Sequence, residues 1–118
     1  MKLLYLDPFS GIAGDMTVGA LLDAGADAEA LMSALESLGT GAAFRIEKTK
    51  RRGIAATKFH VDGSDSKKHR HLPQIMEMIS RSAMPEPAKQ NAARVFEKLG
   101  QAEAKTHAVP IEKVHFHE

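Results

Sequence analysis

The sequence contains no cysteine and no tryptophan, and it has only one tyrosine. Without cysteine the chain cannot form disulfides, use a thiolate nucleophile or bind a metal through sulfur. Histidine and carboxylate side chains are therefore the only strong metal ligands in the sequence. No apolar run is long enough to cross a membrane, and no signal peptide is visible before the first apolar run. We therefore expect a cytoplasmic protein that has no membrane partner.

The sequence also lacks a charge excess of either sign. Its formal net charge is +1 over 118 residues. A strong non-specific nucleic-acid partner would require a clear basic excess, so we expect none. Hydrophobic residues make up 43% and charged residues 26% of the chain, which is typical of a folded globular domain and not of a disordered one. At this length we expect one domain, residues 1–118.

The first apolar run is Leu3-Leu-Tyr-Leu6, and Asp7-Pro8 follows it. An uninterrupted apolar run is typical of a strand that is buried on both faces. Proline ends such a strand because it cannot donate to the ladder. A loop with Gly11 and Gly14 then leads to Asp15 and a helical pattern. The sequence thus predicts a buried strand, a glycine loop and a helix in succession.

Six further elements follow from the spacing of apolar residues. Helical spacing predicts two helices that end at Gly25 and Gly39, and alternation predicts two strands joined by a hairpin tip at residues 50–53. Pro73 and Pro87 suit the first turns of two more helices. In the last helix we expect an inward face made of Ala92, Val95, Phe96, Leu99 and Ala102.

The segment from Val109 onward predicts a short final strand. In an extended segment Val114 and Phe116 would face one side, with His115 and His117 on the other. The expected fold is therefore an α+β, two-layer domain with a mixed or antiparallel sheet and helices packed on one face. Its expected element order is β-α-α-β-β-α-α-β.

The sequence stops at Glu118 with no turn, helix stop or polar tail after it. Domains usually end in less distinctive residues than histidine and glutamate. We therefore expect the chain to be a truncated or split product, the N-terminal fragment of a longer protein.

Two His-x-His motifs are the main candidate metal ligands. His69 and His71 lie in a polar loop at 63–71, which we expect to be exposed and mobile, whereas His115 and His117 lie at the end of the chain with Glu118 directly after them. Imidazole and carboxylate groups suit nickel, zinc, copper and iron, and the general affinity order favours nickel and copper. Taken alone, each motif is more typical of solvent-exposed histidines that bind no metal.

The glycine loop offers a second set of candidates. Asp7 and Asp15 flank it and are the best oxygen ligands for a metal, although both are also typical of a turn and of a helix first turn. Backbone N–H groups at a helix start suit an anion. The candidate substrate- or phosphate-binding residues are therefore Ser10, Gly11, Gly14, Arg51 and Arg52. No catalytic residue is assigned, because the loop lacks a Walker lysine and its serine has no base nearby in sequence.

Two long motifs resemble signatures of a known family. Tyr5-Leu-Asp-Pro-Phe-Ser-Gly-Ile-Ala-Gly-Asp-Met16 is similar to the N-terminal signature of the nickel insertion proteins of the lactate racemase maturation pathway. The end of the chain, from Val109 to Val114-His-Phe-His-Glu118, resembles a second signature of that family. Arg52-Gly-Ile54 with Thr57-Lys58, and His69-Arg-His71, lie between them in the family's order. The resemblance covers essentially the whole chain.

The resemblance implies an enzyme, for the full-length protein, of the nickel chelatase (lyase) type. Members of the family insert Ni²⁺, as the substrate metal, into pyridinium-3,5-bisthiocarboxylic acid mononucleotide in a CTP-dependent reaction that makes the nickel-pincer cofactor. It implies that CTP with Mg²⁺ or Mn²⁺ is bound by a C-terminal domain that this chain lacks. The implied partners are the pyridinium mononucleotide and that C-terminal domain, or a separate polypeptide of the same enzyme. A homo-oligomer is also compatible with it.

On this resemblance we expect the terminal histidines, Glu118 and the two aspartates to meet in one site. Two other functions stay open. A non-catalytic, histidine-based nickel-carrier module would bind metal without the mononucleotide. A metal-free phosphate- or nucleotide-binding domain would not respond to nickel at all.

Overall fold

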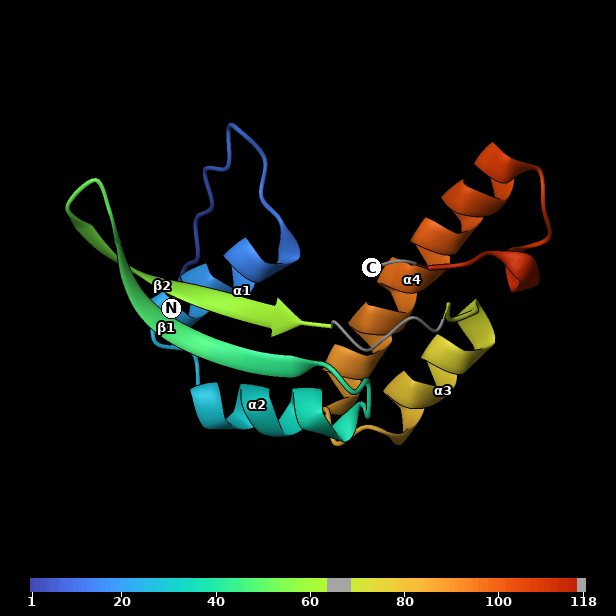
Figure 1. Ribbon diagram of the computed structural model, residues 1–118, viewed down its shortest axis with the longest axis horizontal. Coiled ribbons are helices and arrows are strands. Elements are labelled where there is room, and N and C mark those ends of the chain that lie inside the picture. The colour runs from blue at the N-terminus through green and yellow to red at the C-terminus, as the bar shows by residue number, and fades with distance from the viewer. Residues whose placement is uncertain (64–68, 117–118) are drawn as a thin grey trace. The chain divides into compact units, whose positions relative to one another are not determined.

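Four helices and one β-hairpin make up most of the computed structural model, which describes residues 1–63 and 69–116 (Figure 1). The elements are α1 (Gly14–Asp23), α2 (Ala28–Ser37), β1 (Ala43–Arg51), β2 (Ile54–Asp62), α3 (Leu72–Arg81), α4 (Glu86–His107) and a 3₁₀ turn, η1 (Ile111–Lys113). The α+β class is confirmed, and so is the inner order α-α-β-β-α-α. None of the helices in the described ranges has an apolar stretch that would span a lipid bilayer.

The chain divides into two compact units. The first contains residues 1–28 and 43–62, and therefore holds α1 and the hairpin. The second contains residues 29–42 and the chain from Gly63 onward, and therefore holds most of α2 together with α3, α4 and η1. Each unit has its own packing and is described separately.

The hairpin of the first unit has the predicted position and turn. Its strands pair antiparallel from Ala43↔Asp62 to Arg51↔Ile54. The two turn residues, Arg52 and Gly53, have φ angles of 48° and 83°. Positive φ at both central positions is typical of the type I′ turn, whose twist matches that of the flanking strands.

Helix α1 lies against β2 (Figure 1). Gly19 is the buried residue of this helix. A Cβ atom on Gly19 would lie only 2.7 Å from the Thr57 carbonyl oxygen of β2. Only glycine permits this approach of helix to strand, and Gly19 therefore sets the distance between α1 and the hairpin.

The predicted strand at Leu3–Leu6 is wrong, because no strand forms there. Its side chains are exposed instead, with Leu3 85% and Tyr5 79% accessible. A strand requires a neighbour for its backbone groups. In the described ranges β1 and β2 form a two-stranded sheet and bond only to each other. The segment is apolar, but its side chains are not buried as the side chains of such a run usually are.

The core of the second unit lies between α3 and the end of the chain. Ile75 and Ile79 of α3 pack with Val114 and Phe116, all at most 8% exposed. The rings of Phe96 and Phe116 meet edge to face with centroids 5.7 Å apart. Partly buried side chains surround this core, namely Leu38, Leu72, Met84, Ala92, Leu99 and Ala104.

The predicted inward face of α4 is correct for Ala92, Phe96 and Leu99 and wrong for Val95 and Ala102, which are exposed. The contact stripe instead follows residues 92, 96, 100 and 104, at the four-residue spacing of one helix face. At its centre a Cβ on Gly100 would lie 3.3 Å from both the Ile111 and the Phe116 side chains.

The predicted final strand is replaced by the turn η1 and one isolated bridge. Pro110 precedes the turn, and the Val114 N–H donates to the Ile111 oxygen (3.2 Å). Phe116 then pairs antiparallel with Arg70. The predicted alternation nevertheless holds as far as the structure describes it, since Val114 and Phe116 are buried and His115 is exposed.

We predict that Gly19→Ala destabilises the fold by about 1–3 kcal/mol, the usual cost of overpacking a closed contact. The new methyl group would collide with the Thr57 carbonyl oxygen of β2. Chemical denaturation followed by circular dichroism measures the change. Gly14→Ala is the matched control, because a Cβ there meets nothing within 4 Å. Equal stability of the two variants would contradict the prediction.

Candidate metal-binding histidines and an anion-binding hollow

Three histidines from two segments that are far apart in the sequence lie together on the surface of the second unit. The ring centroids of His71 and His115 are 4.5 Å apart, and those of His69 and His115 are 5.3 Å apart. We call His69, His71 and His115 the histidine cluster. The structure therefore brings both histidines of the first predicted motif and His115 of the second to one place.

The Arg70–Phe116 bridge is what brings these histidines together. The Phe116 N–H donates to the Arg70 carbonyl oxygen at 3.1 Å. The Arg70 guanidinium donates to the Thr40 carbonyl oxygen (2.9 Å), and the Phe116 ring is buried. Side chains alternate along extended backbone, so His69, His71 and His115, which adjoin these two residues in sequence, project from the opposite face. That face carries the histidine cluster.

His71 is held in a defined orientation. Its Nδ1 lies 3.1 Å from the Val114 carbonyl oxygen, and a carbonyl can only accept. Nδ1 must therefore carry the proton, which leaves the Nε2 lone pair of the neutral ring available. Metal-binding histidines are commonly oriented by a carbonyl in this way. The His71 backbone N–H also donates to Gln74 Oε1 (3.1 Å) at the start of α3.

The described residues do not complete a metal site by themselves. Within residues 1–63 and 69–116, no group of three or more histidine, aspartate or glutamate side chains is arranged to hold a metal ion. Two of the predicted ligands, His117 and Glu118, lie outside the described residues, as does the loop predicted to be mobile at 64–68. Asp7 and Asp15 belong to the first unit. An open hollow of about 480 Å³ adjoins the histidine cluster and is also lined by Gln74, Glu77 and Arg81.

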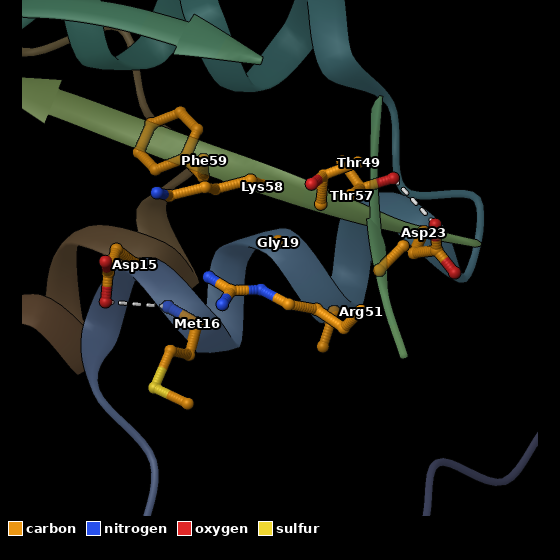
Figure 2. Close-up of a pocket in the computed structure, with 11 residues that line it drawn as sticks. Asp15, Met16, Gly19, Asp23, Thr49, Arg51, Thr57, Lys58 and Phe59 are labelled. Carbon is orange, nitrogen blue, oxygen red and sulfur yellow. Dashed lines mark hydrogen bonds between the residues drawn. The ribbon is translucent and has the colours of Figure 1, made fainter. Parts of the chain in front are cut away.

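A larger hollow of about 800 Å³ lies in the first unit, between α1 and the hairpin (Figure 2). We call it the α1–hairpin hollow. Helix α1 contributes one wall and the ends of the two strands contribute the other. Its charged lining residues are Asp15, Asp23, Arg51 and Lys58.

Two of the residues predicted from sequence, Asp15 and Arg51, line this hollow together. The other predicted substrate residues, Ser10, Gly11, Gly14 and Arg52, are not among its lining residues, and neither is Asp7. Gly11 instead closes a turn, where its N–H donates to the Pro8 oxygen (2.8 Å) with φ at 87°. The sequence did not indicate Asp23, Thr57 and Lys58 as lining residues. Only the packing of α1 on β2 shows which side chains of the helix and the strand line the hollow.

A polar network anchors one end of the α1–hairpin hollow. The Thr57 hydroxyl donates to Asp23 Oδ1 at 2.6 Å and accepts from Lys48 Nζ at 2.7 Å. Lys48 Nζ also lies 3.5 Å from the same carboxylate oxygen. The hydrogen bond from Thr57, assisted by Lys48, lowers the pKa of Asp23 below its ordinary value of 3.8. Asp23 is therefore held as an anion with its charge already balanced.

Comparison with known proteins places the chain in a family of metal-handling proteins. It matches the family described as nickel insertion protein over residues 4–118. The chain therefore belongs to the nickel insertion protein family, and the resemblance seen in the two sequence motifs is confirmed.

Individual relatives carry a more specific name, pyridinium-3,5-bisthiocarboxylic acid mononucleotide nickel insertion protein. The chain is 45% identical to the one from Geobacillus kaustophilus, 44% to one from a Thermotoga species and 45% to one from Desulfitobacterium hafniense. Each match covers all of this chain but only 31%, 33% and 30% of the respective relative. The chain thus spans about a third of the length of these relatives. No solved structure matches it significantly.

We predict that Thr57→Val raises the pKa of Asp23 toward its ordinary value, because the main hydrogen-bond donor is lost. The pKa of Asp23 is lower in the folded chain than in the unfolded chain. The ionised carboxylate therefore stabilises the fold at pH values above its ordinary pKa, and this stabilisation is lost as the pH falls through the lowered pKa. A carboxyl-carbon NMR titration measures the shift. Thr49→Val is the control, because Thr49 lines the same hollow without bonding Asp23. An unmoved Asp23 titration in Thr57→Val would contradict this assignment.

We also predict that neutral His71 is the Nδ1–H tautomer. Long-range ¹H–¹⁵N spectra of the metal-free chain, recorded at mildly alkaline pH, distinguish the two tautomers. His107 is the internal reference, because we expect it to be the opposite, Nε2–H tautomer. Its Nε2 lies 3.1 Å from a Glu103 carboxylate oxygen and must therefore be the donor. Finding His71 as the Nε2–H tautomer would refute the orientation described above.

Proposed function

We propose that this chain is the N-terminal, nickel-handling part of an insertase (a chelatase) that places nickel into pyridinium-3,5-bisthiocarboxylic acid mononucleotide. The product is the nickel-pincer cofactor, and the reaction is CTP-dependent. Membership of the nickel insertion protein family and the names of the relatives support this proposal. Nickel is a substrate of this reaction, so the protein must bind it and then release it.

The observation that carries the proposal is the hydrogen bond between His71 Nδ1 and the Val114 carbonyl oxygen. It leaves Nε2 as the ligating atom of an imidazole whose ring adjoins that of His115. Nickel binds well to imidazole nitrogen. His115 and His69 are exposed, which suits a metal that has to enter the site and leave it.

The proposed ligand set extends beyond the three histidines of the cluster. His117 and Glu118 follow His115 directly in sequence, and we assign them as the groups that complete the nickel site. Asp7 and Asp15 remain candidate oxygen ligands. The part of the relatives that this chain does not cover is proposed to bind CTP with Mg²⁺ or Mn²⁺.

A nickel carrier is the second candidate function. It is favoured by the exposure of His69 and His115, because a metal bound by exposed side chains exchanges readily. A carrier would bind nickel alone, whereas an insertase part would also bind the mononucleotide. Calorimetric titration with a pyridinium mononucleotide separates the two functions.

We predict that His71→Ala and His115→Ala each weaken nickel binding about 10-fold or more, the usual effect of damaging a metal site. Isothermal titration calorimetry with nickel chloride measures the affinity. His107→Ala is the matched control, because this histidine lies on α4 and pairs with Glu103. Nickel affinity that is unchanged in the double variant of His71 and His115 would overturn the proposed site.

A further inference from the structure

We propose that the α1–hairpin hollow binds the phosphate of a mononucleotide through Arg51 and Lys58, with the nucleotide's planar ring directed toward Met16. The identity of the ligand rests on the proposed function. The location of the site and its preference for an anionic ligand are argued from the side chains of the first unit alone.

The two cations of the hollow, Arg51 and Lys58, have no charge partner within residues 1–63 and 69–116. Among the described residues, the side chains of Arg51 and Lys58 form no hydrogen bond and no ion pair. Figure 2 shows both side chains extended in the same direction, toward the Asp15 end of α1. Two cations held on one side of a hollow without an anion between them favour an anionic ligand.

The carboxylates of the hollow do not compete with such a ligand for these cations. Asp23 accepts from the Thr57 hydroxyl and lies near Lys48. Asp15 Oδ1 accepts the Met16 backbone N–H at 2.8 Å, as Figure 2 also shows. Lys48 balances the charge of Asp23, and Asp15, whose partner is a neutral N–H, offsets only one of the two cations, so the net charge left to attract a ligand is positive.

The rest of the lining suits an aromatic ring. Phe59 is 4% exposed and stacks on Phe44 with centroids 6.0 Å apart, which makes it a rigid wall. Met16 is 58% exposed, and its flexible thioether can pack on the face or edge of a ring. The volume of about 800 Å³ lies in the range of small-ligand sites.

The geometry of the hollow is preorganised by contacts away from the cations. The close approach of Gly19 to the Thr57 carbonyl oxygen sets the separation of α1 and β2. The Asp23–Thr57–Lys48 network ties the end of α1 to both strands. Asp23 and Thr57 are therefore positioning residues, while Arg51 and Lys58 contact the phosphate. Arginine offers a two-pronged donor set and lysine a point charge, a pair suited to a tetrahedral phosphate.

Calorimetric titration of the 118-residue chain with nicotinic acid mononucleotide, in the absence of nickel, tests the inference. We expect binding that is about 10-fold weaker for nicotinic acid riboside, which lacks the phosphate, because a hydrogen bond to a charged group contributes on that scale. Lys58→Ala and Arg51→Ala should each weaken binding of the mononucleotide about 10-fold. Inorganic phosphate should compete with the mononucleotide for the wild-type chain.

Arg52→Ala is the matched control, because it removes the same charge next to Arg51 from a side chain that does not line the hollow. Circular dichroism confirms that each variant is folded. Equal affinity for mononucleotide and riboside, no binding of either, or full affinity in Lys58→Ala would each overturn the inference. Full mononucleotide affinity in Lys58→Ala would overturn the site but leave the insertase function standing, whereas no binding of either compound would overturn the inference and favour the nickel carrier. Nickel binding by the histidine cluster is measured separately and depends on neither outcome.

Discussion

One backbone hydrogen bond, from the Phe116 N–H to the Arg70 carbonyl oxygen, determines where His71 and His115 lie. On one side of this bridge the Phe116 ring enters the core and the Arg70 guanidinium reaches Thr40. On the other side the alternation of extended backbone projects His71 and His115 into contact. Core packing and the histidine cluster therefore share one backbone contact, and neither can shift without moving the other.

The first unit depends on a comparable steric constraint. Because Gly19 has no side chain, α1 can approach β2 closely enough for Asp23 to reach the Thr57 hydroxyl. That approach shapes the hollow that Arg51 and Lys58 line. The two units thus offer different chemistry, imidazole nitrogen in one and unpaired cations in the other. Nickel and a phosphate-bearing ligand require these two kinds of group.

The exposed run at Leu3–Leu6 shows the limit of reading burial from an apolar pattern. An uninterrupted apolar run is typical of a buried strand, but a strand also needs a partner with free backbone groups. The hairpin strands β1 and β2 use theirs on each other.

The sequence by itself determined the family, the α+β class, the helices and hairpin, and the two histidine motifs, because these depend on local spacing and on long motifs. Only the tertiary structure decided that His71 and His115 adjoin, and that Asp15 and Arg51 share a hollow with Lys58 while Arg52 does not. The register of a bridge and the separation of a helix from a strand depend on contacts between residues far apart in the chain. No local sequence pattern specifies those contacts, and it is those contacts that bring the candidate site residues together.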